Sequence, residues 1–219
     1  MELFLSATPF EAEFLAGRAE GSFRFRGRSG LTGSGWVWLE LGVGKVNAAM
    51  TLAAFLEAHP EVSRILVLGL AGAYPASGLG LGELVLASEE IQADLGTERG
   101  LEPLGFPALS VRGRRYYNRF PAEAGFTAEL AQKLGLKPLP FLTADKVSET
   151  ITEAEARARR WRAAAENMEG AAVAQVALWR GLPWAELRAI SNLAGVRERA
   201  RWRVEDALDA LKRAMVRLF

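Results

Sequence analysis

The sequence of 219 residues contains no cysteine and only one histidine, His59. The absence of cysteine excludes disulfides, thiolate nucleophiles and cysteine-ligated metal sites. Without a cluster of histidines or cysteines, a zinc site is not expected either. His59 precedes Pro60 where a helix is expected to end, so we interpret it as a surface or C-terminal capping residue rather than a catalytic one.

An excess of one charge is also absent. The 27 Lys and Arg residues against 26 Asp and Glu give a net charge of +1, which leaves no electrostatic footprint for a nucleic-acid partner. The stretch from Ile65 to Gly82 is uncharged, but Pro75 and its glycines predict a buried strand leading into a loop, not a membrane span. No basic leader with a cleavage site opens the chain, so we expect a cytoplasmic protein without membrane contacts.

The composition is that of a globular protein, with 50% hydrophobic and 24% charged residues. At this length, residues 1–219 are expected to form a single domain with a sizeable core. Strands are expected over residues 3–7, 36–41, 64–70, 83–88, 139–143 and 184–191. Helices are expected over residues 9–16, 46–58, 127–134, 152–164, 169–180 and 202–218. This alternation predicts a layered α/β fold.

Two further local features complete this reading. Residues 96–125, rich in Gly, Pro and Arg, are expected to form a long loop, and long loops in compact domains tend to be functional. Thr152 followed by Glu155 is typical of a capping box at the start of a helix.

The segment from Ala165 to Gln175 places Glu169 between an extended run and a helix of small apolar residues. Such a helix is normally buried, and its N-terminal N–H groups favour a carboxylate in the first turn. We therefore expect Glu169 to be charged, rigid and suited to binding hydroxyl groups such as those of a sugar. The alternative is a glutamate that only caps the helix, and the segment alone does not decide between them.

A second polar group follows an alternating, mostly apolar strand that delivers Ser191 and Asn192 at its carboxyl end. Ligands of open α/β sheets bind beyond the carboxyl ends of the strands. The alternative for Asn192 is a turn residue that merely follows a strand.

Four motifs occur in a fixed order and together resemble one superfamily. They are Gly42-Val-Gly-Lys-Val-Asn47, Leu68-Gly-Leu-Ala-Gly-Ala73, Asn167-Met-Glu-Gly-Ala-Ala-Val-Ala174 and Arg188-Ala-Ile-Ser-Asn192. The set resembles the purine nucleoside phosphorylases and nucleosidases, in particular the branch of methylthioadenosine/adenosylhomocysteine nucleosidases and futalosine hydrolases. The segments from Ser6 to Glu11 and from Gly82 to Ala87 extend the similarity. The resemblance implies a three-layer α/β fold with a mixed, twisted central sheet flanked by helices, and a reaction without a cofactor.

The resemblance also implies roles for individual residues. Glu169 matches the carboxylate that binds the ribose hydroxyls, and Met168 matches a residue that packs on the sugar. Glu11 is the candidate base that activates water, with Glu13 one turn away as the alternative base. Glu11 is also explained without a catalytic role, as a glutamate in the first turn of a helix. The remaining expected substrate contacts are Asn167, Gly72, Ala71, Val147, Ser148 and Gly44. Val147 and Ser148 lie where relatives place an aromatic residue against the base, and that residue is absent here.

Asn192 and Leu70 are the positions that select the substrate and the nucleophile. Adenine-specific relatives carry an aspartate in place of Asn192. An asparagine cannot act as a general acid, but its amide can accept from N7–H and donate to an oxygen on C6, which favours 6-oxopurines. Leu70 stands where related enzymes often have Ser or Thr, and phosphorolysis needs donors there. An apolar side chain at this position favours water over phosphate.

The turn from Gly42 to Gly44 resembles a phosphate loop only weakly and is explained by a tight strand-to-helix turn. One or two arginines could bind a carboxylate on the 5′ side of the substrate, and the sequence does not choose among Arg112, Arg114, Arg115, Arg197, Arg199 and Arg201. The predicted function is that of the futalosine hydrolase family, which releases hypoxanthine and dehypoxanthine futalosine in menaquinone biosynthesis. The alternatives are a methylthioadenosine-type or inosine-type nucleosidase, a phosphorylase, and a non-catalytic nucleoside-binding protein. The six tryptophans and several apolar helices make a homo-oligomer, a dimer or larger, plausible.

Overall fold

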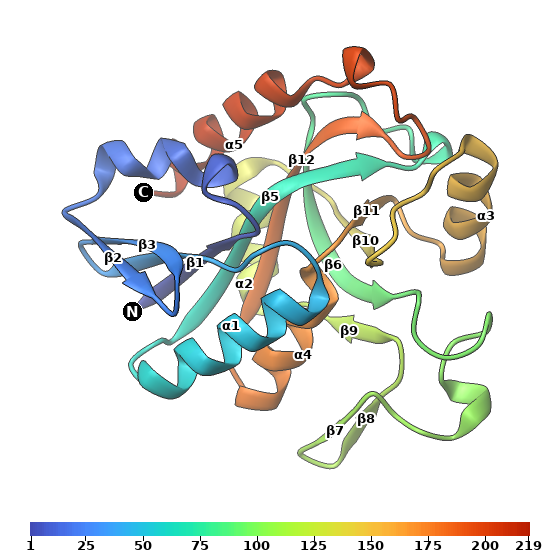
Figure 1. The fold of residues 1–219 in the computed structure, drawn as a ribbon, viewed down its shortest axis with the longest axis horizontal. Coiled ribbons are helices and arrows are strands. Elements are labelled where there is room, and N and C mark those ends of the chain that lie inside the picture. The colour runs from blue at the N-terminus through green and yellow to red at the C-terminus, as the bar shows by residue number, and fades with distance from the viewer.

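The computed structural model describes all 219 residues and is built around a ten-stranded twisted sheet (Figure 1). Its strands are β1 (Glu2–Ser6), β2 (Gly21–Phe25), β3 (Arg28–Gly33), β4 (Trp36–Glu40), β5 (Arg64–Ala73), β6 (Leu84–Gln92), β9 (Arg119–Pro121), β10 (Pro138–Thr143), β11 (Ala165–Asn167) and β12 (Trp184–Leu193). Their order is β11-β10-β6-β12-β5-β1-β4-β3-β2, with β9 paired to β6. The sheet is mixed, because β5 runs parallel to β1 and β12 whereas β6 runs antiparallel to β12.

The apolar strand β5 lies at the centre of this sheet. Strand β5 is bonded to β1 on one side and to β12 on the other. Strands that are buried on both faces need no polar alternation, which explains the continuous apolar sequence from Ile65 to Leu68. Alternate residues of β5 serve opposite faces: Ile65 and Val67 belong to one core cluster, and Leu66 and Leu68 to another.

Helices cover both faces of the sheet. The helices are α1 (Lys45–Ala58), α2 (Ala124–Leu134), α3 (Ile151–Trp161), α4 (Gly170–Arg180) and α5 (Val204–Leu218), with short 3₁₀ segments η1 (Pro9–Arg18), η2 (Pro75–Ser77), η3 (Glu102–Leu104) and η4 (Arg199–Arg201). Helices α1 and α4 pack on one face through residues such as Phe55 and Val173. Segment η1, α2 and α5 pack on the other through residues such as Leu15 and Leu211. The predicted three-layer α/β fold with a mixed sheet is therefore confirmed. No helix has the length and apolar character needed to cross a bilayer.

Several local expectations are wrong. Residues 96–125 are not one long loop: they contain η3, the hairpin of β7 (Leu109–Val111) and β8 (Arg114–Tyr116), strand β9 and the start of α2. The side chain of Asn118 links segments of this region: it accepts a hydrogen bond from the amide of Leu101 (2.7 Å) and donates to the carbonyls of Gln92 and Leu95. The strands β2 and β3 were not expected at all.

Two helix starts also differ from expectation. Helix α3 is capped by Thr150, whose hydroxyl accepts from the amide of Glu153 (3.2 Å), and not by Thr152 with Glu155. The segment after Pro9 is a 3₁₀ helix interrupted by non-helical backbone at Ala12, not a regular α-helix.

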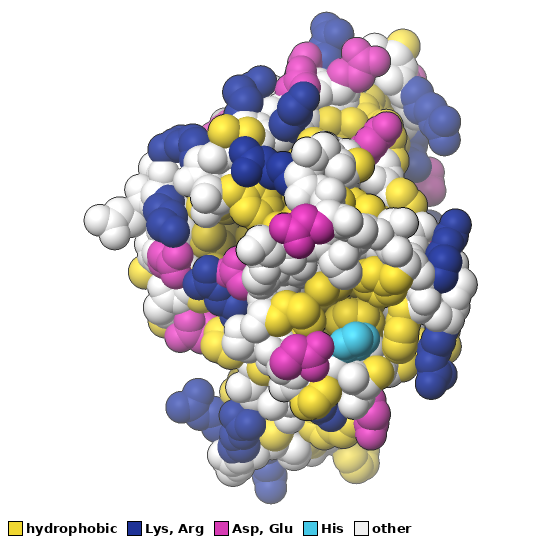
Figure 2. Space-filling model, turned by 90° about the vertical axis from the view of Figure 1, so that its left-hand side faces the viewer, with side chains coloured by type: hydrophobic (Ala, Val, Ile, Leu, Met, Phe, Trp, Pro, Cys, Tyr) yellow, Lys and Arg dark blue, Asp and Glu magenta, His cyan; other side chains and the backbone are white.

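The only histidine lies on the surface. Figure 2 shows its ring (cyan) among hydrophobic side chains, on the side of the molecule that also carries the N-terminal strands. His59 closes α1, donating its backbone N–H to the carbonyl of Phe55 (2.9 Å), and its ring stacks on the ring of Phe55 with centroids 4.1 Å apart. The predicted role as a surface or C-terminal capping residue is confirmed.

Candidate active site

A cavity of about 330 Å³ lies at the carboxyl ends of β5 and β12. It brings together Glu11, Glu169 and Asn192, which come from η1, the start of α4 and the end of β12.

 Glu11 lies far from the other two in sequence, so the fold of the sheet brings it to them. The other expected contacts that line the cavity are Ala71, Gly72, Val147, Asn167 and Met168.

Two expected contacts do not line the cavity but lie behind it. Ser148 is fully buried and donates its N–H and its hydroxyl to Glu166, which does line the cavity. Gly44 donates its N–H to Glu169. Both residues therefore act on the cavity through another side chain.

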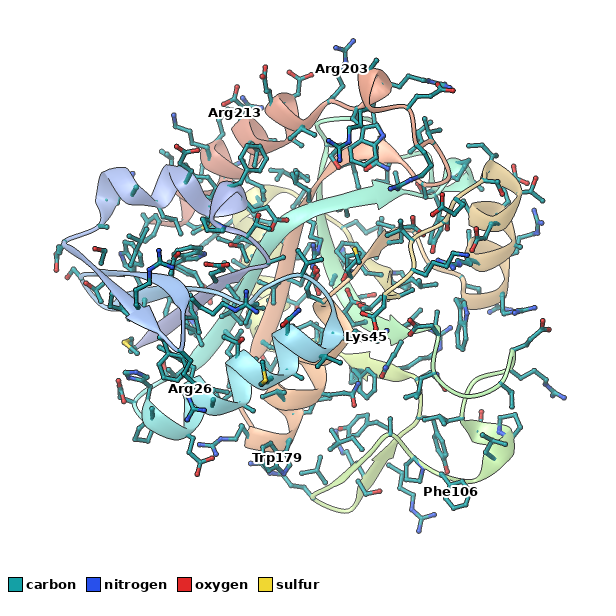
Figure 3. The ribbon with its side chains drawn as sticks, viewed as in Figure 1. Arg26, Lys45, Phe106, Trp179, Arg203 and Arg213 are labelled. Carbon is teal, nitrogen blue, oxygen red and sulfur yellow. The ribbon has the colours of Figure 1, made fainter.

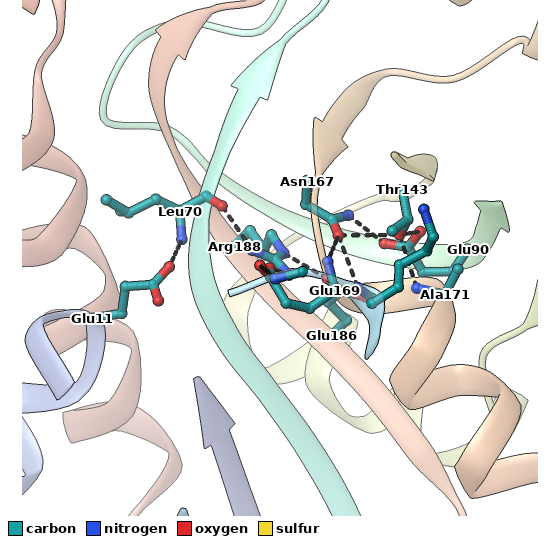
Figure 4. Close-up of polar contacts among 12 residues, drawn as sticks. Glu11, Leu70, Glu90, Thr143, Asn167, Glu169, Ala171, Glu186 and Arg188 are labelled. Carbon is teal, nitrogen blue, oxygen red and sulfur yellow. Dashed lines mark hydrogen bonds and ion pairs between the residues drawn. The ribbon is translucent and has the colours of Figure 1, made fainter. Parts of the chain in front are cut away.

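Glu169 occupies the N-cap position of α4, but its side chain does not cap the helix. Its Oε1 accepts from the N–H of Gly44 (3.1 Å), and its Oε2 pairs with Nη2 of Arg188 (3.4 Å). The cap is supplied by Asn167, whose Oδ1 accepts from the amides of Glu169 (3.0 Å) and Gly170 (2.8 Å), as Figure 4 shows. The interpretation of Glu169 as a mere helix cap is thus wrong.

The expectation that the helix N-terminus simply holds Glu169 charged also needs correction. The side chain is 4% exposed, and burial raises its pKa above the ordinary value. Arg188 and the N–H of Gly44 act in the opposite direction, and the neighbouring Glu11 adds to the rise. The ion pair and the amide therefore only partly offset the effects of burial and of the neighbouring carboxylates on this pKa.

Arg188 was not among the expected site residues, although it lines the cavity and is 2% exposed. Its Nε donates to Glu186 (2.5 Å), and its Nη1 donates to the carbonyl of Leu70 (2.8 Å). Burial acts to lower its pKa, but the carboxylates of Glu186 and Glu169 more than offset this effect, so the pKa is raised. The signal in the sequence was the pair of charges at positions 186 and 188, which a strand places on one face.

A second buried carboxyl, that of Glu90 on β6, lies next to Glu186. Glu90 is fully buried and accepts from Thr143 Oγ1 (2.7 Å) and Asn167 Nδ2 (2.5 Å). Burial and the proximity of Glu186 raise its pKa well above the ordinary value. A Cβ at Gly170 would collide with carboxyl oxygens of both glutamates, so only glycine fits at this position. Burial and the neighbouring carboxyl therefore favour the protonated form of Glu90.

Glu11 is positioned by both of its oxygens. One accepts from the N–H (3.0 Å) and the hydroxyl (3.1 Å) of Thr8, and the other accepts from the N–H of Leu70 on β5 (3.0 Å). The break in η1 at Ala12 accompanies this turn of the carboxylate towards the sheet. Glu13 is exposed and does not line the cavity.

Asn192 reaches the cavity because β12 contains an irregularity. Ile190 pairs with Ala71 and Asn192 with Gly72, so Ser191 is an extra residue in the ladder. Such a bulge re-aims side chains, and both Ser191 and Asn192 line the cavity. The amide Oδ1 accepts from Ser191 Oγ (2.9 Å), and Nδ2 donates to the carbonyl of Leu193 (3.0 Å). Because a carbonyl can only accept, this second bond fixes the orientation of the amide.

The cavity is also lined by residues that were not expected as substrate contacts or were left among alternatives. Phe10, Thr8 and Trp202 line it, and of the six candidate arginines only Arg197 does. The guanidinium of Arg197 lies 5.4 Å from the ring centroid of Trp202. The turn before α1 is tight, as expected, with φ of +86° at Gly42 and +88° at Gly44. No group of three or more His, Cys, Asp or Glu side chains is arranged to hold a metal ion.

Comparisons with known proteins agree with this architecture. A family model described as "Phosphorylase superfamily" matches residues 3–219. The structure superimposes on a methylthioadenosine/adenosylhomocysteine nucleosidase of Colwellia psychrerythraea, solved with adenine, with a TM-score of 0.83 at 22% identity, covering 99% of this chain and 93% of that one. A futalosine hydrolase of Helicobacter pylori gives 0.82 at 19% identity, covering 99% and 96%. At these identities the solved structures show the fold alone.

Sequence relatives define the family more narrowly. A futalosine hydrolase of Thermus thermophilus is 57% identical over 218 residues, covering 100% of this chain and 95% of the relative. A futalosine hydrolase of Streptomyces coelicolor is 36% identical over 190 residues, covering 84% and 78%. The chain therefore belongs to the futalosine hydrolase family of the phosphorylase superfamily.

Proposed function

We propose that this protein hydrolyses the N-glycosidic bond of futalosine, releasing hypoxanthine and dehypoxanthine futalosine, as a step of menaquinone biosynthesis. The observation that carries the proposal is the single cavity that gathers Glu11, Glu169 and Asn192. The 57% identity to a futalosine hydrolase over the whole chain supports it. In this proposal residues 1–219 act as one catalytic domain without a cofactor. We also propose that the protein is located in the cytoplasm.

The reaction replaces the C1′–N9 bond with a bond from C1′ to the oxygen of water. As the bond breaks, the sugar develops the positive charge of an oxocarbenium ion. Glu169 binds the ribose hydroxyls and places negative charge near this cation. Glu11 takes a proton from the attacking water, and hypoxanthine leaves neutral after N7 gains a proton from solvent. Glu11 returns its proton to solvent, so one water is consumed and the protons balance.

The hydrogen-bonding groups of Asn192 that remain unused suit a 6-oxopurine. With one bond to Ser191 and one to Leu193, the amide retains one N–H and one lone pair of its oxygen. The lone pair accepts N7–H, and the N–H donates to the oxygen on C6. Mispairing of a polar edge at such a site typically costs about 10⁴-fold or more in kcat/KM.

Water, rather than phosphate, is the proposed nucleophile. The backbone N–H of Leu70 donates to Glu11, and its carbonyl accepts from Arg188. This wall therefore has no free donor at Leu70 for an anion and presents the Glu11 carboxylate instead. Phosphorolysis would require donors where a carboxylate stands.

We also propose that the protein forms a homodimer. A second cavity of about 440 Å³ lies between α1, α4 and the segment before β7, and most of the residues lining it are hydrophobic. Around it Val46 is 75%, Met50 61%, Phe106 72% and Trp179 55% exposed. Figure 3 shows Phe106 and Trp179 at the same lower edge of the molecule. A second copy of this chain is the proposed occupant, because α1 carries both this surface and the N-terminal turn that contacts Glu169.

A panel of nucleosides tests the function. Purified protein is incubated with futalosine, inosine, methylthioadenosine and adenosylhomocysteine, with and without phosphate, and the free base is measured by chromatography. We expect hypoxanthine from futalosine at a rate independent of phosphate. Release of a sugar 1-phosphate only when phosphate is present would identify a phosphorylase, preferential release of adenine would identify a methylthioadenosine-type nucleosidase, and tight binding without base release would identify a binding protein.

A further inference from the structure

The proposed hydrolysis leaves one carboxylate of the cavity without a role. Glu166 on β11 is 5% exposed and lines the cavity. Its Oε2 accepts from Ser148 Oγ (2.6 Å), its Oε1 accepts from the Ser148 amide (3.1 Å), and Arg157 Nη1 lies 3.8 Å from Oε2. These contacts hold the carboxylate in place; Oε1 still has a lone pair for a ligand, whereas Oε2 also lies 3.4 Å from the Ser148 amide nitrogen.

Glu166 and Asn192 are neighbours in the cavity wall. Strand β11 pairs with β5 at Gly72, and the end of β12 pairs with β5 at the same residue. A Cβ built on Gly72 would lie 3.2 Å from Asn192 Nδ2 and 3.5 Å from Glu166 Cγ. The glycine therefore leaves the space between an amide and a carboxylate open to a ligand.

This wall offers acceptors rather than donors beside Asn192. The N–H and the hydroxyl of Ser148 both donate to Glu166, and the nearby guanidinium of Arg157 donates to the carbonyl of Lys146 and to Glu153. A carboxylate only accepts hydrogen bonds, so the group that meets it must donate. In a 6-oxopurine the ring nitrogen next to C6, N1, carries a hydrogen, whereas N1 of adenine carries a lone pair.

We propose that Glu166 determines base specificity by accepting the N1–H of a 6-oxopurine while Asn192 binds the oxygen on C6 and N7. Adenine would place the N1 lone pair against the carboxylate oxygens. This inference rests on the proposed function and adds a second residue to base selection. Hydrogen bonds to charged groups are among the stronger ones in proteins, so we expect Glu166 to contribute about 10- to 100-fold to the discrimination.

Binding of free bases tests the proposal without turnover. The Kd of hypoxanthine, 1-deazahypoxanthine and adenine is measured by calorimetry for the full chain and for Glu166→Gln. In the wild-type protein, replacing N1–H by C–H is expected to weaken binding at least tenfold. In Glu166→Gln, that loss and the preference for hypoxanthine over adenine are both expected to shrink by about tenfold or more.

Glu153→Gln is the matched control. Glu153 also binds Arg157, with Oε1 2.7 Å from Nη2, but it does not line the cavity. It is expected to keep the wild-type preference. If Glu166→Gln weakens all three bases equally, Glu166 only supports Ser148 and the proposal is overturned.

The wild-type measurement stands by itself if the variant does not fold. Equal wild-type affinity for hypoxanthine and 1-deazahypoxanthine would overturn the proposal in that case. A failure to hydrolyse futalosine would instead overturn the proposed function, and it is distinguished from these outcomes because base binding is measured separately.

Discussion

Arg188 and Glu169 form an ion pair in which both side chains are buried, with Nη2 of the arginine 3.4 Å from Oε2 of the glutamate. The same guanidinium is bound to Glu186 and to the carbonyl of Leu70. These partners belong to β12 and β5, the central strands of the sheet. The proposed sugar-binding carboxylate is therefore held by the core of the protein rather than by a surface loop.

Removal of the Glu169 carboxylate is expected to abolish most activity while the fold is retained. Glu169→Ala removes the proposed contact with the ribose hydroxyls and the negative charge near the developing cation, so we expect kcat to fall about 10²- to 10³-fold. Glu169→Gln, which keeps the volume, is the companion variant. Base release is measured by chromatography and the fold by circular dichroism. Wild-type turnover in either folded variant would contradict the proposed role.

The two N-terminal glutamates are expected to differ sharply. Glu11→Gln removes the proposed base and is expected to lower kcat by about 10²-fold or more. Glu13→Gln changes an exposed side chain outside the cavity, and we expect wild-type kinetics. Steady-state assays of both proteins on futalosine provide the comparison, and equal losses would show that neither effect comes from the cavity.

Asn192→Asp is expected to erode the preference for hypoxanthine over adenine as the leaving base. An aspartate removes the amide N–H that binds the oxygen on C6 and introduces a group that can carry a proton to N7. The measurement is kcat/KM for futalosine and for its 6-amino counterpart. An unchanged ratio of the two values would show that Asn192 does not read the base.

The buried pair of Glu90 and Glu186 is expected to make the folded protein less stable as the pH rises. The pKa of Glu90 is raised from its ordinary value of 4.5, so the folded state keeps a proton that the unfolded chain loses above that value. Stability is then highest below the unfolded pKa and falls as the pH rises towards the folded pKa. Burial of Glu169 acts in the same direction.

Glu90→Gln tests this pH dependence. The neutral amide cannot ionise, so the urea midpoint is expected to fall less with rising pH than in the wild-type protein. Glu89→Gln, which changes the adjacent carboxylate that pairs with Arg119, is the control and is expected to follow the wild-type slope. Parallel pH profiles for the wild-type protein and Glu90→Gln would contradict the raised pKa of Glu90.

Gly44 is expected to tolerate no side chain. At a φ of +88° an alanine is strained, and its Cβ would lie 3.3 Å from Asp145 Oδ1. Gly44→Ala is expected to destabilise the protein by about 1–3 kcal/mol and to lower kcat by displacing the N–H that binds Glu169. Gly17→Ala, where a Cβ meets nothing within 4 Å, is expected to change stability by less than about 0.5 kcal/mol. Urea denaturation and steady-state assays measure both effects, and equal stabilities would refute the argument from backbone strain.

The elements with a strong local pattern were predictable from the sequence. Strand β5 follows from its apolar run, α1 from the turn at Gly42 and Gly44, and the start of α4 from the segment around Glu169. The strands β2 and β3 are short and contain glycines, and their pairing carries no clear local signal. The order in residues 96–125 depends on Asn118, whose partners at Gln92 and Leu95 are distant in sequence.

Only those site residues that lie in the sequence motifs were predictable. Glu169 and Asn192 stand out because each ends a recognisable segment. The contact of Gly44 with Glu169 spans 125 residues, and Glu90 meets Glu186 only because β6 lies beside β12 in the sheet. Charges on two separate apolar strands give no indication of such a meeting until the strand order is known.

The extra residue at Ser191 has a consequence for how this fold can change its substrate. Upstream of it, β12 keeps an uninterrupted ladder with β5, and at the irregularity two consecutive side chains, Ser191 and Asn192, line the cavity. Substitutions at these two positions can alter the nucleobase that is accepted without exchanging inner and outer residues along the strand. Divergence of leaving-group preference can therefore proceed one side chain at a time on an unaltered scaffold.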